Sequence, residues 1–129
     1  MAEVALLITA LLFGGMVLYS FGFAAFLFTA LPPDTAGPVI RQAFPHFYLF
    51  VAVTSALAAL LVSWQDTLSA ILLGLIALTV IPTRQVLMPA INNATDSGNK
   101  KRFHYLHGAS VLITLAHIGM AGVVLARFL

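Results

Sequence analysis

The stretch Ala70–Val80 reads AILLGLIALTV, and it decides the class of fold because it carries almost no polar side chain. It lies inside one of four long apolar runs, which span Val4–Leu31, Phe44–Ser63, Thr67–Met88 and Tyr105–Phe128. Each run has at least the roughly 20 residues that a helix needs to cross a hydrocarbon layer about 30 Å thick. Lipid satisfies no backbone polar group, and the strict alternation of a barrel strand is missing, so the runs must be helices. The sequence therefore predicts an all-α protein, a four-transmembrane-helix up-down bundle with the lipid bilayer as its surroundings.

Length and composition limit the alternatives. The 129 residues give room for a single integral membrane domain, residues 1–129. Hydrophobic residues make up 61% of the chain and charged residues 8%, whereas soluble domains carry about 25% charged residues. A net charge of +2 is too small to indicate a nucleic-acid partner, and the absence of Cys excludes disulfides and thiolate ligands. The first run is about twice as long as the roughly 7–15 apolar residues of a signal peptide, so we expect it to remain as a helix.

The charges of the connections predict the orientation. Four spans place both termini and the turn Trp64–Asp66 on one side, and the connections Pro32–Ala43 and Pro89–His104 on the other. The second side holds or adjoins most of the cations, which are Arg41, Arg84, Lys100, Lys101 and Arg102. The terminal side has only Arg127. Under the positive-inside rule, we expect a multi-pass protein of the cell inner membrane with both termini outside the cytoplasm.

Individual residues predict where the helices begin, bend and end. Asp66 is placed to cap the third helix at Thr67. Pro82 lies inside the third run and is expected to kink it, and Pro89 is expected to stop it. Glycines let transmembrane backbones approach closely, either within the bundle or across a homo-oligomer contact. They lie in the first and last runs, at Gly14, Gly15, Gly22, Gly108, Gly119 and Gly122.

One polar stripe runs deep into the last helix. His117 lies about 12 residues into it, or roughly 18 Å along the axis at 1.5 Å per residue, near the midplane. Thr114, Ser110 and His107 precede it at helical spacing, so we expect the stripe to face the bundle interior. Three interpretations of the mid-membrane residues His117 and Thr114 stay open. His117 is a neutral histidine bonded to a hydroxyl on another helix, a proton-relay or ligand residue, or a cofactor ligand.

A second polar cluster is expected where the helices end on the cytoplasmic side. His46 begins the second predicted helix, Arg84 ends the third, and His104 and His107 share a face at the start of the fourth. The predicted ligand-binding residues are His107, Arg84, Asn92, Asp96, His46 and Ser110.

Several roles are open for this cluster. His46, His104 and His107 form a candidate metal site with a nearby carboxylate, and His46 with His107 forms a candidate haem pair. The cation Arg84 instead favours an anionic ligand or headgroup, or a structural ion pair with Asp34 or Asp96. Charged and imidazole side chains also cost little free energy at a membrane boundary, so a purely structural role is a further option. The cofactor is therefore left unknown, with haem and a transition metal as the options.

A family resemblance is carried by short motifs along nearly the whole chain. They include Gly14-Gly15, Phe21–Phe28, Ala43–Tyr48, Met88–Asn93 with Asp96, and Arg102–Ser110. Together they resemble the transmembrane-protein-205-like family of four-span membrane proteins. The resemblance marks as motif positions Phe44, Pro45, Tyr48, Pro89, Asn92, Asp96, Arg102, Leu106, His107 and Ser110. The segment Leu31–Asp34 departs from the pattern, because the first helix of the family usually ends in a more apolar segment.

The resemblance implies the four-helix fold and singles out His107 among the histidines. It implies no established activity, although an association of eukaryotic relatives with the handling of metal drugs hints at transport. No nucleophile–base–carboxylate set, phosphate loop or HExxH pattern is present, so we expect no enzyme.

The leading hypothesis is a membrane bundle that binds or moves a small ligand or ion through the cytoplasmic polar layer. Because four helices enclose little space, we expect a transporter of this size to be a homo-oligomer. The alternatives are an accessory subunit of a larger membrane complex, and a haem- or metal-binding redox protein that uses His46 and His107.

Overall fold

The computed structural model describes all 129 residues and is entirely helical. Four helical spans are long and apolar enough to cross a membrane, which confirms the predicted all-α bundle. The first span is α1 (Ala2–Val17), the π-helical segment η1 (Leu18–Phe23) and α2 (Ala24–Ala30), and the second is α3 (Pro33–Val62). The third is α4 (Thr67–Pro82), the π-helical segment η2 (Thr83–Leu87) and α5 (Met88–Asp96), and the last is α6 (Lys100–Arg127).

The helices extend further at one end than hydrophobicity predicts. The second span begins at Pro33 rather than Phe44, the third continues to Asp96 rather than ending at Met88, and α6 begins at Lys100 rather than Tyr105. The predicted long connections are therefore wrong, since most of their residues are helical. A helix of 30 residues is about 45 Å long at 1.5 Å per residue, which exceeds the roughly 30 Å of hydrocarbon. The polar ends of the helices therefore reach the headgroup region while remaining folded.

Prolines and caps explain the helix boundaries. Asp66 accepts a hydrogen bond from the Ser69 N–H and caps α4, as predicted. Pro89 lies in the first turn of α5, directly after the π-helical segment η2, and the helix continues beyond it, so the prediction that it stops the helix is wrong. Pro82 ends the regular part of α4, and the chain continues through η2, because a π-helical turn accommodates a disrupted hydrogen-bond ladder.

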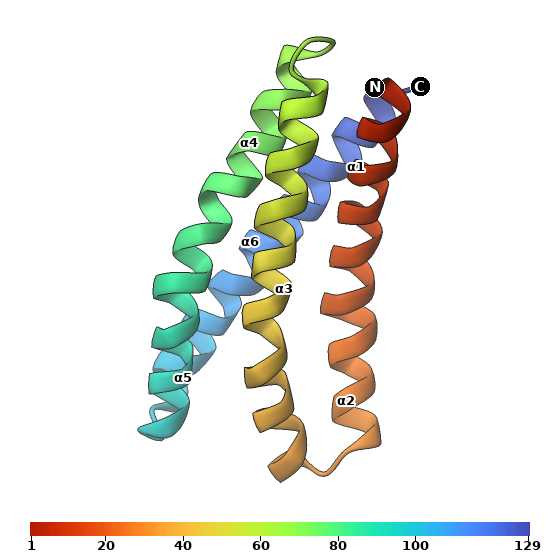
Figure 1. Cartoon of the computed structure of the whole chain (residues 1–129). Helices are drawn as coiled ribbons and strands as arrows, with labels where there is room; N and C mark the ends of the chain where they lie inside the picture. Colours follow the sequence, from red (N-terminus) through yellow and green to blue (C-terminus); the bar gives the residue numbers. More distant parts are fainter.

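The four spans pack in a ring in chain order. α1 packs on α3, α3 on α4, α4 on α6, and α6 on α1. Both termini and the α3–α4 turn lie at one end, at the top of Figure 1, which we call the terminal end. Gly15 and Gly122 allow α1 to approach its neighbours, because a Cβ on either would lie 2.8 Å from the Phe50 ring or 3.3 Å from the Phe13 ring. These two glycines therefore serve packing within the bundle.

An ion pair closes the terminal end. Arg127 Nε lies 2.7 Å from Asp66 Oδ2, and Arg127 Nη2 lies 3.0 Å from Asp66 Oδ1. Ser69 Oγ also donates to Asp66 Oδ2, at 2.7 Å. A two-bond pair between a guanidinium and a carboxylate fixes both distance and orientation. It joins the last turn of α6 to the cap of α4.

The opposite end, which we call the open end, is less tightly closed. The lower part of the first span, α2, packs on α3, whereas the first half of α6 packs on α5. In Figure 1, α6 crosses the bundle obliquely, so that its first half lies far from α2 while its second half lies beside α1. This divergence positions the cavity described next.

Candidate ligand-binding cavity

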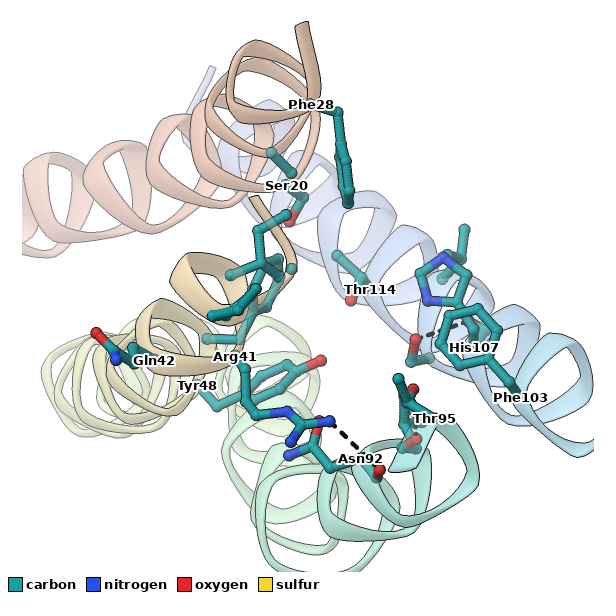
Figure 2. A pocket seen from close by; sticks show the side chains of 18 of the residues that line it. Ser20, Phe28, Arg41, Gln42, Tyr48, Asn92, Thr95, Phe103, His107 and Thr114 are labelled. Carbon is teal, nitrogen blue, oxygen red and sulfur yellow. Dashed lines mark hydrogen bonds between the residues drawn. The ribbon is translucent and has the colours of Figure 1, made fainter. Parts of the chain in front are cut away.

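A cavity of about 670 Å³ lies at the open end, between α2, α3, α5 and α6. All four spans contribute to its lining, and Figure 2 shows side chains such as Phe28, Tyr48 and Thr114 pointing inward. The lining is of mixed character, with apolar and aromatic side chains interleaved with polar groups. Its volume falls within the roughly 300–1,000 Å³ of pockets that hold drug-sized molecules.

An ion pair lies at the shallow level of the cavity. Arg41 on α3 donates to both carboxylate oxygens of Asp96 on α5, at 2.9 and 3.3 Å, and to the Asn92 carbonyl oxygen at 3.3 Å. Both side chains are partly exposed, so the pair contributes little to stability. Its chief effect is positional, because it holds the only cation of the lining beside the Asn92 amide (Figure 2).

Three hydroxyls lie at the deep level. Ser20 on η1, Tyr48 on α3 and Thr114 on α6 come from three different spans. Tyr48 lies seven residues beyond Arg41 on α3, which is about 10 Å along the axis at 1.5 Å per residue. In Figure 2, no hydrogen bond reaches the Tyr48 or Thr114 hydroxyl from the other residues drawn. The cavity therefore has two polar levels separated by apolar wall.

Ser20 has an unsatisfied hydroxyl. Its Oγ is buried and has no hydrogen-bond partner in the protein. Buried polar atoms in native proteins almost always have a partner, so each exception needs an explanation. Ser20 lies in the π-helical segment η1, and such segments are frequent at functional sites because they reorient side chains. A polar group entering the cavity would supply the missing partner.

His107 and Phe103 form the wall on α6. Their rings stack in parallel, with centroids 5.3 Å apart and an interplanar angle of 6°. Ser110 Oγ donates to the His107 carbonyl oxygen at 2.7 Å, so its hydroxyl is occupied by its own helix. The His107 ring makes no hydrogen bond in Figure 2 and faces the cavity across from Arg41. It is therefore available to a ligand.

An aromatic cluster supports the inner wall. Tyr19 donates to the Ala43 carbonyl oxygen at 2.9 Å and stacks on Phe47, with ring centroids 4.8 Å apart. Phe44 contacts Tyr19 edge-on and also packs against Tyr48. These contacts fix the face of α3 from which Phe44 and Tyr48 reach the cavity.

The structure brings together most, but not all, of the predicted site residues. His107, Asn92, Asp96, Ser110 and Thr114 line the cavity. Arg84 and His46 are not among the lining residues.

The cation of the site is Arg41 rather than Arg84. Arg84 Nε donates to the Pro45 carbonyl oxygen at 3.0 Å, and Nη1 donates to Gln85 Oε1 at 2.7 Å, so Arg84 braces α3 and pairs with neither Asp34 nor Asp96. The sequence analysis offers Arg84 as an ion-pair partner of Asp96, but the partner in the structure is Arg41. Arg41 falls in the predicted connection Pro32–Ala43, whereas the structure places it on α3. Had α3 been extended to Pro33, the spacing Gly37, Arg41, Phe44 and Tyr48 would have put Arg41 on the cavity stripe.

The three histidines of the candidate metal site are not assembled. His46 is exposed on α3 outside the cavity, and His104 is exposed and packs against Phe103. The protein contains no group of three or more His, Asp or Glu side chains placed to hold a metal ion. His107 lines the cavity and His46 does not, so the cavity itself offers only one of the two imidazoles of the candidate haem pair.

His117 lies one turn above the deepest cavity residue and is bonded to another helix. Its Nε2 lies 2.7 Å from Thr79 Oγ1 on α4. The Thr79 hydroxyl also lies 2.6 Å from the Leu75 carbonyl oxygen, which is an acceptor only. Because a hydroxyl has one proton, Thr79 donates to Leu75 and accepts from His117 Nε2–H. This is the structural role that the sequence allowed for His117, and it fixes the tautomer.

Comparison with known proteins places the chain in a family. Residues 7–100 match the family described as "Domain of unknown function (DUF4149)". The chain belongs to this family. The DUF4149 match covers the first three spans and includes Arg41, Tyr48, Asn92 and Asp96, whereas His107 and Thr114 lie beyond it. No curated protein and no solved structure matches the chain.

Proposed function

We propose that this DUF4149 protein is an integral inner-membrane protein that binds a small ligand in the cavity at its open end. The observation that carries the proposal is a cavity of about 670 Å³ whose lining holds polar groups that the protein itself leaves without partners. Pockets of this kind, mostly apolar with a few convergent polar groups, are the usual form of small-molecule sites. Beside the Arg41–Asp96 ion pair, the lining offers the Asn92 amide and the His107 imidazole, and it includes three hydroxyls with no partner in the protein, on Ser20, Tyr48 and Thr114.

The orientation is part of the proposal. The open end carries Arg41, Arg84, Lys100, Lys101 and Arg102, and the terminal end carries Arg127. The positive-inside rule assigns the open end to the cytoplasm and both termini to the opposite side. The ligand site would then lie at the cytoplasmic face.

Binding is better supported than passage. The terminal half is filled by fully buried side chains such as Leu12, Leu73 and Val124, and the Asp66–Arg127 pair closes its end. No specific observation favours an accessory subunit, a homo-oligomer or a redox protein over a ligand-binding protein. The family that the comparison shows is DUF4149, and the resemblance to the transmembrane-protein-205-like family stays an expectation. Its motif residues Tyr48, Asn92, Asp96, His107 and Ser110 all line the cavity.

Filling the cavity tests the proposal. Ala24 lines the cavity, whereas Ala10 is exposed on the same span outside it. We would purify the wild type and the variants Ala24→Trp and Ala10→Trp in a mild detergent and record native mass spectra. A bound small molecule is expected on the wild type and on Ala10→Trp, and it should be lost from Ala24→Trp. Equal retention in all three, or a bare mass in all three, would overturn the proposal.

A further inference from the structure

The cavity has a side opening as well as an end. α6 packs on α1 in the terminal half, but below it α2 packs on α3 and the first half of α6 packs on α5. The residues on either side of this gap are apolar and exposed: Phe21 on η1 and Phe28 on α2 are 49% and 60% exposed, and Val111 on α6 is 38% exposed. All three also line the cavity. In Figure 2, Phe28 lies at the edge of α2 next to the space that leads toward Thr114 and His107.

We propose that the cavity opens to the bilayer between α2 and α6, and that its ligand is a membrane amphiphile with an anionic headgroup. The inference rests on the proposed function and names the class of ligand and its route. The headgroup lies inside, and its hydrocarbon chain leaves between Phe28 and Val111 into the surrounding lipid.

The polarity of the walls sets this direction of binding. Arg41 and Tyr48 on α3 and Asn92 on α5 stand on the walls away from the gap (Figure 2), whereas the Ser20 and Thr114 hydroxyls lie at the deep level on the two spans that border it. The reverse arrangement would put a hydrocarbon chain against the Ser20, Tyr48 and Thr114 hydroxyls and leave them unsatisfied. A headgroup with several acceptor oxygens satisfies them instead.

Charge favours an anion. Arg41 is the only cation in the lining and is paired with Asp96, so the excess of positive charge lies around the cavity, but the guanidinium keeps donors beyond those used by Asp96 and Asn92. The open end as a whole carries Arg41, Arg84, Lys100, Lys101 and Arg102 against Asp34 and Asp96. Basic groups at a membrane surface attract anionic lipids.

A tryptophan reporter tests the route and the headgroup together. The chain has a single Trp, Trp64, which is 92% exposed at the terminal end and can be replaced by Phe. Phe28→Trp places the reporter at the gap, and Phe26→Trp is the matched control, since Phe26 is 61% exposed on the same helix but does not line the cavity. Each protein is placed in phosphatidylcholine vesicles containing phosphatidylglycerol or phosphatidylcholine with brominated chains, which quench tryptophan on contact.

At Phe28→Trp, brominated phosphatidylglycerol should quench with an apparent association constant about tenfold above that of brominated phosphatidylcholine, the effect of one hydrogen bond to a charged group. At Phe26→Trp, the two lipids should quench equally. Arg41→Gln should abolish the preference, and Tyr48→Phe, which removes a hydroxyl without a partner, should reduce it about threefold. Arg102→Gln removes the same charge from the open end but outside the cavity, so it should lower the preference much less than Arg41→Gln does.

Other outcomes overturn the inference. Equal quenching by both lipids at Phe28→Trp means that the gap meets lipid without selecting a headgroup. An absence of quenching there means that the gap is shut or is covered by protein. If either occurs while a bound species is still lost from Ala24→Trp in the mass spectra, the ligand enters from the aqueous side and the proposed function stands. If both experiments fail, both proposals fall.

Discussion

Replacing Thr79 by valine tests the hydrogen bond that joins α4 to α6 just above the cavity. The change is nearly isosteric and removes only the hydroxyl that accepts from His117 Nε2–H at 2.7 Å. The His117 side chain is 5% exposed, so its N–H has no access to water as a substitute partner. Removing the other partner, by His117→Leu, leaves no polar group unsatisfied, because the Thr79 hydroxyl still donates to the Leu75 carbonyl oxygen at 2.6 Å.

The two substitutions should therefore have unequal effects. A buried donor without a partner costs about 1–3 kcal/mol, and hydrogen bonds between membrane helices average about 0.6 kcal/mol with a maximum near 1.7. We expect Thr79→Val to lower the free energy of unfolding by about 1–2 kcal/mol, and His117→Leu to lower it by less. In the His117→Leu background, Thr79→Val should be almost neutral, because no donor remains to lose its partner.

The measurement is a double-mutant cycle. Each protein is unfolded reversibly by titrating sodium dodecyl sulfate into dodecyl maltoside micelles, and helix content is followed by far-ultraviolet circular dichroism. The coupling free energy comes from the four proteins of the cycle. An equal cost of Thr79→Val in both backgrounds would mean that the two side chains do not interact, which would refute the hydrogen bond and the assigned tautomer.

Two further predictions concern the packing of the terminal half. Hydrogen bonds from Arg127 and from Ser69 hold the pKa of Asp66 well below its ordinary value of 3.8. The stability that comes from this depressed pKa is present above about pH 4 and is lost as the pH falls. The melting temperature of the wild type should therefore drop in acid, and that of Asp66→Asn should drop less. Gly15→Ala puts a Cβ 2.8 Å from the Phe50 ring and should cost about 1–3 kcal/mol in the same unfolding assay, whereas Gly14→Ala, whose Cβ meets nothing within 4 Å, should be neutral or stabilising; equal effects at the two positions would contradict the packing.

Hydrophobicity was sufficient to predict the number of spans and the class of fold, because lipid leaves an apolar chain few ways to satisfy its backbone. It failed at the helix ends. Pro33–Ala43 and Pro89–Asp96 are polar or proline-containing, yet both are helical. Their prolines occupy first turns, as at Pro33 and Pro89, or cost single hydrogen bonds, as at Pro38. A hydropathy window measures where lipid ends and does not measure where a helix ends.

The composition of the site was easier to predict than its geometry. His107, Asn92, Asp96 and Ser110 share one end of the bundle in any up-down arrangement, so the sequence could place them together. The choice between Arg41 and Arg84 depends on how each helix is rotated about its axis. Rotation follows from contacts between helices, such as that of Arg84 with the Pro45 carbonyl oxygen. No single-sequence pattern records such a contact.

The two halves of the bundle differ in how their spans are joined, because the polar contacts between neighbouring spans are concentrated in the terminal half. In the terminal half, Asp66 binds Arg127, Gly15 admits Phe50, and Thr79 accepts from His117, so neighbouring spans are tied to one another. Below His117 no side-chain hydrogen bond or ion pair joins α2 to α6, and the shallow Arg41–Asp96 pair joins α3 to α5 instead. The separation of α2 and α6 can therefore change without breaking a hydrogen bond described above. A ligand that widens the gap would break only apolar contacts, and the surrounding lipid would replace them. A site that is filled from the bilayer requires such a low-cost opening.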